Sequence, residues 1–222
     1  MSDSSDRRAA QKARTRARIR TAAHDMFATA GFDATTVVDI SAAAGVSVQT
    51  VFNHFASKEE LFFAERAAWV DGPAAAVRDR AAGACPLASL RRHLVASVED
   101  YARSTSEPHH RRMVEVLLGT PALQTFERDL HEEAVAHLAS ELAAVGRGRP
   151  HPEGAGTAVL AEVTAAIWMA AVRAIVVNLR SNPCPMSEDA VGAAVRLTDR
   201  TLGDLEAGLT VTPLSAPSAL VG

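Results

Sequence analysis

Two short helical patterns joined at a single glycine constrain this chain more than any other feature of its sequence. Thr36 and Asp39 have the spacing of a capping box that opens the first helix. Gly45 lies where the chain must reverse, because glycine adopts a positive φ without steric cost, and Ser47 is placed to cap the second helix. This is the pattern of a helix-turn-helix, so the sequence predicts binding to double-stranded DNA.

An apolar stripe before this motif completes a small N-terminal unit. Hydrophobic residues recur through 19–30 at the i, i+3, i+4 spacing of one helix face, and Gly31 ends the pattern. Val51 and Phe55 are four residues apart in the second helix and are expected to pack inward. We therefore predict that residues 1–60 form a basic arm and a three-helix DNA-binding domain.

The start of the chain is strongly basic. Seven Lys and Arg residues lie between Arg7 and Arg20 with no acid among them, whereas the whole chain has a formal net charge of -3. DNA binding would therefore rest on a local patch that faces phosphates and not on a global field. For the segment before Arg14, a solvated and frayed terminus is the alternative interpretation.

Beyond residue 60 the sequence indicates further helices separated by Gly and Pro. Ser57 and Glu60 have the spacing of a second capping box, which predicts a fourth helix that carries Leu61, Phe62 and Trp69. Longer helical patterns follow at about 87–105, 121–144, 155–180 and 187–209. No long stretch alternates at period two, so we predict an all-α fold. The predicted larger C-terminal domain is 61–210, and the flexible tail is 211–222.

The N-terminal pattern resembles the DNA-binding domain of the tetracycline-repressor (TetR) family. The resemblance covers residues 14–65 and rests on Ile40 and the segments 22–31, 35–36, 44–47, 52–55 and 57–61. It implies a homodimeric transcription regulator, most often a repressor, whose C-terminal helical domain binds a ligand and makes the dimer. A two-fold dimer presents two recognition helices to successive major grooves, so a pseudo-palindromic operator is expected.

The resemblance also implies a set of DNA-contacting positions. The recognition helix starts with residues 48–50, which would face the major groove. Phosphate contacts would come from the residues at positions 36, 52, 54 and 58. The family usually has tyrosine where this chain has Phe52, which cannot donate a hydrogen bond. The resemblance therefore implies that this phosphate contact is either missing or made by a neighbour, Asn53 or His54. Gln49 is the main candidate for reading a base, because its amide can pair bidentately with adenine. The predicted DNA-binding residues are Thr36, Ser47, Val48, Gln49, Thr50, Phe52, Asn53, His54 and Lys58.

Residues 155–180 form a helical pattern that is apolar nearly all round, so the helix must be buried on every side. A partner subunit on one side and a cavity or core on the other would achieve this, with 187–209 completing a four-helix dimer interface. The longest apolar run, 163–172, is too short to span a bilayer, and no apolar run follows the basic N-terminus. We therefore expect a cytoplasmic protein with no membrane partner.

A small, mostly apolar effector is expected to bind between the C-terminal helices. Arg173 is the main charged candidate for that site, and an interface salt bridge or snorkelling at the helix end is the alternative interpretation. Each apolar candidate also has a plain core interpretation. The predicted ligand-binding residues are Tyr101, Met113, Leu117, Phe126, Trp168, Met169 and Arg173.

Three other functions receive less support from the sequence. His131 and His137 lie at i, i+4 from Glu127 and Glu133, which permits a metal site but is more typical of a solvated helix face, so no metal or cofactor is predicted. No catalytic constellation stands out, so an enzyme or carrier with an incidental helix-turn-helix is disfavoured. A DNA-binding regulator without an effector, controlled by dimerisation or by the two thiols Cys85 and Cys184, is the alternative function.

Overall fold

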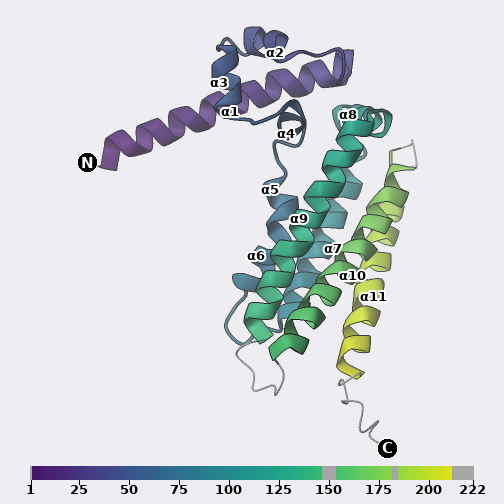
Figure 1. Cartoon of the computed structure of the whole chain (residues 1–222). Coiled ribbons are helices and arrows are strands. Elements are labelled where there is room, and N and C mark those ends of the chain that lie inside the picture. Colours follow the sequence, from purple (N-terminus) through teal and green to yellow (C-terminus); the bar gives the residue numbers. More distant parts are fainter. Residues whose placement is uncertain (1, 147–153, 182–184, 212–222) are drawn as a thin grey trace, which may run out of the picture. The chain divides into compact units, whose positions relative to one another are not determined.

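The computed structural model describes residues 2–146, 154–181 and 185–211. Within these ranges the chain is helical and contains no strand, which confirms the predicted all-α fold. Most of the predicted tail 211–222 lies outside the described residues, as does Cys184. The helices (Figure 1) are α1 Ser2–Ala30, α2 Val37–Ala43, α3 Val48–Phe52, α4 Lys58–Phe62, α5 Ala67–Val70, α6 Gly72–Arg78, α7 Pro86–Ser104, α8 Pro108–Gly119, α9 Pro121–Gly146, α10 Gly154–Arg180 and α11 Glu188–Val211.

The chain divides into two compact units. Unit 1 comprises Met1–Ala67 and Pro108–Leu130, and unit 2 comprises Ala68–Glu107 and His131–Gly222. The helix-turn-helix therefore shares a unit with α8 and the first part of α9, two elements that are distant from it in sequence. The boundary predicted after residue 60 remains a prediction.

Aromatic side chains hold unit 1 together. The predicted stripe on α1 is confirmed, since Ile19, Ala23 and Phe27 are fully buried. The Phe27 ring centroid lies 5.2 Å from that of Phe32 and 5.7 Å from that of Phe62, so α1, the α1–α2 connection and α4 meet at one cluster. Rings at such separations attract one another beyond the gain from burial alone. This cluster fixes α4 and α2 against α1.

The fourth helix is shorter than predicted. Ser57 caps α4 as expected, accepting a hydrogen bond from the Glu60 amide at 3.0 Å. The helix ends at Phe62, however, and Trp69 belongs to the separate α5. The imidazole Nε2 of His24 lies 3.3 and 3.1 Å from the carbonyl oxygens of Leu61 and Phe62. These terminal carbonyls thus find a partner outside the helix, which allows α4 to stop there.

In unit 2, α7 packs against α6, α10 and α11. Leu94 and Val98 of α7 are buried, as is Leu202 of α11. Arg91 ties α7 and α11 together, because its Nε donates to Asp199 Oδ1 at 2.7 Å. This hydrogen bond raises the pKa of Arg91 and lowers that of Asp199.

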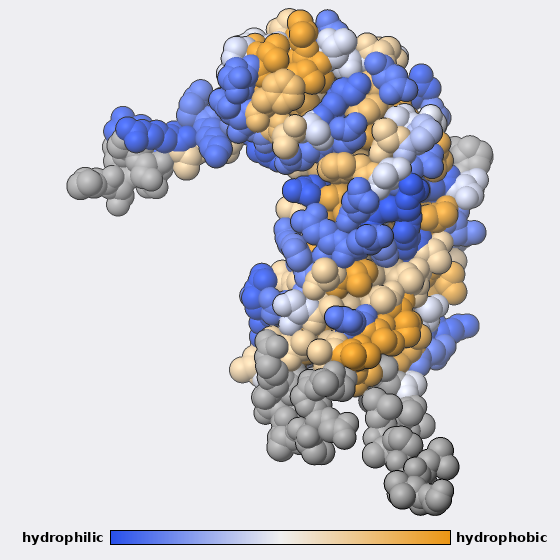
Figure 2. All heavy atoms as spheres, viewed as in Figure 1, coloured by the Kyte–Doolittle hydropathy of each residue, from blue (hydrophilic) through white to orange (hydrophobic). Residues whose placement is uncertain are grey.

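Helix α10 buries one face and exposes an apolar one. Ala165 and Trp168 are completely buried within unit 2, whereas Val163, Ile167 and Val177 are between 45 and 47% exposed. In Figure 2 hydrophobic residues gather on the visible surface of unit 2 where α10 lies. The sequence pattern predicts that this helix is buried on every side. Within the single chain, however, only one side of α10 is buried.

The apolar segment of α10 is longer than the run 163–172 that the sequence pattern marks. Between Ala158 and Arg180, 23 residues of α10 have a mean hydropathy of 1.8, and by length and composition they could cross a bilayer; 28% of the apolar window is buried. Core helices of water-soluble proteins meet the same criteria, and α10 packs onto α7 and α11.

Candidate nucleic-acid interface

The helix-turn-helix forms with the predicted caps. The Thr36 hydroxyl accepts from the Asp39 amide at 3.2 Å, and the Asp39 carboxylate accepts from the Thr36 amide at 3.3 Å, which completes a capping box at α2. Gly45 has a φ of 61°, a conformation that glycine adopts without strain. The Ser47 hydroxyl accepts from the Thr50 amide at 3.1 Å and opens α3. Short polar contacts therefore fix both helices and the turn.

Helix α3 separates an inner face from an outer face. Val51 on α3 and Phe55 just beyond it are each 2% exposed and belong to the core of unit 1, as predicted. Gln49 and Asn53 are exposed, and their side chains share a hydrogen bond of 3.1 Å from Gln49 Nε2 to Asn53 Oδ1. Val48 and Thr50 are half-buried. The outer face thus presents one pre-oriented amide with a free carbonyl oxygen.

Phe52 is 47% exposed, which is unusual for so large an apolar side chain and leaves its ring available for apolar contact. The chain offers no hydroxyl at this position. Its neighbour His54 is half-buried, and its Nδ1 is buried without a hydrogen-bond partner. Burial, together with the charges of Lys12 and Arg16, lowers the pKa of His54. The imidazole is therefore neutral at pH 7 and can donate one hydrogen bond.

Arg16 organises the end of the recognition segment, a role that the sequence pattern does not reveal. Its guanidinium donates to the carbonyl oxygen of His54 and lies 4.0 Å from the centroid of the Phe55 ring. The sequence shows only that Lys12 and Arg16 have i, i+4 spacing and therefore lie on one face of the helix. One cation of the basic arm thus supports the fold of unit 1.

Lys58 also has an internal role. Its ammonium donates to the carbonyl oxygens of Phe32 at 2.8 Å and Thr35 at 3.1 Å, and it lies 4.2 Å from the centroid of the Phe32 ring. An ammonium has three N–H donors, so one remains for the predicted phosphate contact. The side chain joins the start of α4 to the connection between α1 and α2.

The basic arm is part of a helix. Helix α1 begins at Ser2, and each residue from Arg7 to Arg14 is exposed. The first buried residue along α1 within the described side chains is Ile19. The arm is therefore a continuous, solvated extension of the helix that carries the core of unit 1.

The predicted ligand-binding residues divide between the two units. Met113, Leu117 and Phe126 belong to unit 1, where Phe126 stacks on Phe63 with ring centroids 5.6 Å apart. The remaining four belong to unit 2, in which Tyr101 accepts a hydrogen bond from Arg180 at 3.1 Å. One pocket lies between α1 and α2, and another is lined by residues of α7, α11 and the segments beside them. None of the seven predicted residues lines either, so this set remains a prediction.

Two polar features of unit 2 concern metal binding and thiol redox control, the two functions that the sequence supports less. His137 Nδ1 lies 2.9 Å from Asp71 Oδ1, so one histidine of the possible metal group pairs with a carboxylate. Cys85 is an exposed free thiol whose Sγ lies 3.9 Å from Glu206 Oε1.

Comparison with known proteins agrees with this geometry. Residues 19–64 match the family model for bacterial regulatory proteins of the tetR family. No curated protein sequence matches the chain.

Solved structures of other proteins share the fold, and three of them show the extent of the similarity to this chain. A protein of Mesorhizobium loti MAFF303099 assigned to the TetR family of transcriptional regulators has a TM-score of 0.57 at 20% identity, covering 90% of this chain and 97% of its own. FadR of Thermus thermophilus, a TetR-family repressor in complex with lauroyl-CoA, has a TM-score of 0.51 at 22% identity, with coverages of 92% and 100%. SmeT in complex with triclosan has a TM-score of 0.53 at 22% identity, with coverages of 84% and 90%. The match at residues 19–64 and the capped helix-turn-helix identify an N-terminal DNA-binding domain of the tetR family of bacterial regulatory proteins, and the solved structures show that the chain shares their all-helical fold.

Proposed function

We propose that the chain is a homodimeric repressor that binds a pseudo-palindromic operator and is released by a small, mostly apolar effector. The observation that carries the DNA-binding part is the outer face of α3, where Gln49 and Asn53 are exposed behind a capped turn. A short helix of this kind fits the major groove, and an oriented amide reads adenine there.

The exposed face of α10 supports the dimer. Val159, Val163, Ile167 and Val177 recur at helical spacing along it and are between 45 and 60% exposed, and Leu197 on the neighbouring α11 is 55% exposed. Isolated apolar residues on a surface need no explanation, but a contiguous stripe of this kind is typical of an interface. A two-fold axis next to α10 and α11 would bury the stripe against its own copy.

A buried donor supports the effector. Trp168 of α10 is completely buried, and its indole Nε1 has no hydrogen-bond partner among the described residues. Leaving such a group unpaired costs roughly 1–3 kcal/mol. An effector with one acceptor, such as a carbonyl or ether oxygen, would satisfy it. The structural relatives FadR and SmeT hold lauroyl-CoA and triclosan, both of which combine an apolar body with polar atoms.

The mechanism is a population shift. The effector binds a conformation of the dimer in which the spacing of the two α3 helices does not match successive major grooves, so ligand and DNA oppose one another. By linkage, the factor by which effector weakens DNA binding equals the factor by which DNA weakens effector binding.

Selection from genomic fragments at two salt concentrations tests the DNA-binding part. A preferred pseudo-palindrome, with affinity that falls steeply as salt rises, is expected, because several cations displace counterions. If no fragment is preferred over random DNA, the regulator function is wrong. Thermal-shift screening of apolar compounds then tests the effector, since a true effector raises the melting temperature and releases operator DNA together.

A regulator without an effector is the second candidate. The observation that favours it is that three residues predicted to line an effector pocket are buried. Leu117, Trp168 and Met169 are between 0 and 4% exposed, as expected of ordinary core residues. In this version DNA binding responds to dimerisation or to oxidation of Cys85, which is exposed. Operator affinity measured before and after thiol oxidation, with Cys85→Ser as the control, distinguishes the two candidates.

A further inference from the structure

One titratable group of the recognition segment lies near two cations of α1. His54 follows α3, and the guanidinium of Arg16 donates to its carbonyl oxygen while lying 4.0 Å from the centroid of the Phe55 ring. The half-buried imidazole is therefore held in place close to the charges of Arg16 and Lys12. We propose that His54 takes up a proton when unit 1 binds DNA, so that operator affinity rises as the pH falls below neutrality. The proposal rests on the proposed function and concerns the regulation of the same surface.

The free protein disfavours the charged imidazole for two reasons. Nδ1 of His54 is buried and has no hydrogen-bond partner among the described residues, so a proton on this nitrogen has no acceptor. Lys12 and Arg16 add like charge from α1. Burial, together with these two charges, lowers the pKa of His54. Unit 1 therefore keeps His54 neutral at pH 7 when DNA is absent.

No carboxylate of the described residues offsets these cations at the imidazole. Segment 47–57, which contains α3, has His54 as its single ionisable side chain. On α2 the Asp39 carboxylate is held in the capping box, and on α4 Glu60 accepts from a backbone amide while Lys58 donates to two backbone carbonyls. The pKa of His54 accordingly depends on burial and on the two cations of α1. A counter-charge must come from outside the chain.

A DNA phosphate supplies this counter-charge. Because Nδ1 is buried, an acceptor can bind the imidazole only through Nε2. Phe52, two residues earlier, has no hydroxyl, so His54 is the ionisable donor at this end of α3. Phosphates also neutralise Lys12 and Arg16, which removes the like-charge repulsion present in the free protein. The pKa of His54 is therefore higher in the complex than in the free protein, and binding consumes protons between the two values.

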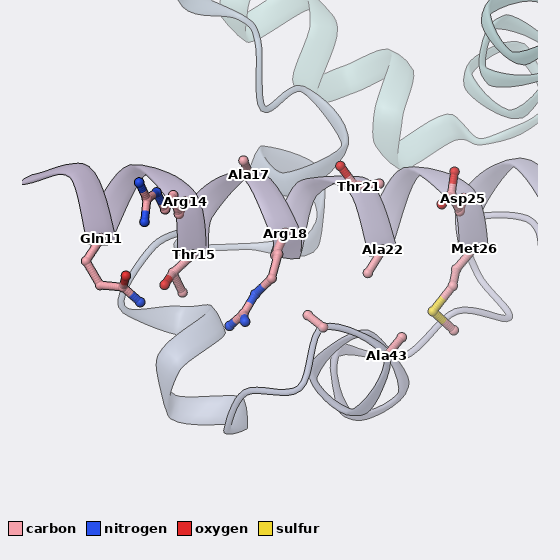
Figure 3. Close-up of a pocket in the computed structure, with 11 residues that line it drawn as sticks. Gln11, Arg14, Thr15, Ala17, Arg18, Thr21, Ala22, Asp25, Met26 and Ala43 are labelled. Carbon is pink, nitrogen blue, oxygen red and sulfur yellow. The ribbon is translucent and has the colours of Figure 1, made fainter.

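Helix α1 provides a matched pair of variants. Lys12 and Arg16 share one face at i, i+4 spacing, whereas Arg14 and Arg18 share a face about 200° away. Arg14 and Arg18 line the groove between α1 and α2, and Figure 3 shows Arg18 extending from α1 toward α2. Neither of these two arginines contributes to the pKa of His54. Lys12→Gln and Arg14→Gln thus remove the same charge from the arm, but only the first acts on the imidazole.

The pH dependence of DNA binding tests the proposal. Fluorescence anisotropy with the selected operator duplex is measured at constant ionic strength and well below the unfolding midpoint. The association constant of the wild type should rise as pH falls from about 8 to about 6, with an uptake of up to about one proton for each protomer. Isothermal titration calorimetry in two buffers of different ionisation enthalpy counts these protons.

Four variants assign the uptake to His54. His54→Gln keeps an N–H donor but does not titrate, so most of the uptake should be lost. His137→Gln, at an exposed position of unit 2, should keep the wild-type value. Lys12→Gln should reduce the uptake at pH 7, because the pKa of His54 in the free protein then lies closer to its value in the complex. Arg14→Gln should weaken binding at every pH and leave the uptake unchanged.

The outcomes separate this proposal from the function on which it rests. Absence of specific binding by the wild type overturns the proposed function itself. Specific binding whose affinity is independent of pH, or falls on acidification, overturns only the proton uptake. Equal uptake by His54→Gln and the wild type also overturns it, because the proton then goes to another group. NMR titration of the His54 imidazole in the free and DNA-bound wild type needs no variant, and an equal pKa in both states overturns the proposal as well.

Discussion

The ammonium of Lys58 donates to the carbonyl oxygen of Phe32 across 26 positions of sequence, at 2.8 Å. This bond joins the first turn of α4 to the loop that places α2. The family resemblance assigns the same residue to a phosphate. Both roles are compatible, because the second internal acceptor, Thr35, leaves one ammonium N–H unused.

We expect Lys58→Ala to lower both stability and DNA affinity. Loss of the charged hydrogen bonds to Phe32 and Thr35 should reduce the free energy of unfolding by about 1–2 kcal/mol. Affinity should fall by a similar factor for every operator sequence, because a phosphate contact carries no base information. Urea denaturation and binding to a randomised operator library measure the two effects. An unchanged unfolding curve would show that the internal bonds contribute nothing.

Gln49→Ala should relax the preference for one base in each half-site, by roughly 1–3 kcal/mol, because the amide is the best base-reading group on α3. Asn53→Ala should do so to a smaller extent, since it removes the hydrogen bond that orients Gln49. In the double variant the two effects should not add. Selection from the randomised library at fixed salt decides this, and an unchanged preference in Gln49→Ala would exclude that residue as the base reader.

Local chemistry makes the helix-turn-helix predictable. The caps at Thr36 and Ser47 and the turn at Gly45 depend on residues within three positions of one another, so the sequence alone specifies them. The bonds of Arg16 and Lys58 link positions 38 and 26 residues apart. No sequence pattern encodes such a distance, and in the sequence both residues resemble ordinary members of a phosphate-facing surface.

The length of α4 and the grouping of helices could not be predicted for a related reason. The carbonyls at the end of α4 are satisfied by His24 of α1, a tertiary contact that replaces the next helical turn. Likewise α8 joins unit 1 because Leu117 packs into the aromatic core there, although its periodicity resembles that of any amphipathic helix. The residues of a ligand site depend on such groupings, so periodicity alone could not specify them.

Gly72→Ala should destabilise unit 2. A Cβ atom at this position would lie 2.8 Å from Nε2 of His93, closer than van der Waals contact allows. Relieving the overlap requires α6 and α7 to separate or the imidazole to leave its site, at a cost of about 1–3 kcal/mol. Gly119→Ala is the matched control, because nothing lies within 4 Å of its Cβ position. A thermal melt of Gly72→Ala/His93→Ala should regain stability over Gly72→Ala; failure to do so would locate the strain elsewhere.

A charge on the exposed face of α10 should dissociate the dimer without unfolding the chain. Ile167→Asp introduces a carboxylate where the wild-type side chain is 45% exposed in the single chain. Burying an unpaired charge in an interface is costly, so the variant should sediment as a monomer and lose operator affinity. Leu202→Asp, at a residue that is completely buried within unit 2, should unfold the protein instead. If Ile167→Asp remains a dimer, the interface lies elsewhere.

Stability should fall on acidification because histidines in both units, His54 among them, are held in the neutral form by burial. Burial lowers the pKa of His24 in unit 1 and of His93 in unit 2 below the ordinary value of 6.5. A group whose pKa is depressed by folding contributes its full stability above the unfolded pKa, and this contribution is lost as pH falls from 6.5 through the folded pKa. The midpoint of thermal unfolding should therefore be constant near about pH 7.5 and decrease below about pH 6.5.

The variant His24→Gln isolates one of these contributions. The Gln amide can still donate to the carbonyl oxygens of Leu61 and Phe62, but it does not titrate, so its unfolding midpoint should depend less steeply on pH between about 6.5 and 5. His137→Gln is the control, because that histidine is exposed and belongs to unit 2. Carboxylates contribute mainly below this window, since their ordinary pKa values are near about 4. An identical pH dependence in His24→Gln and the wild type would show that protonation of His24 is not coupled to the folding of unit 1.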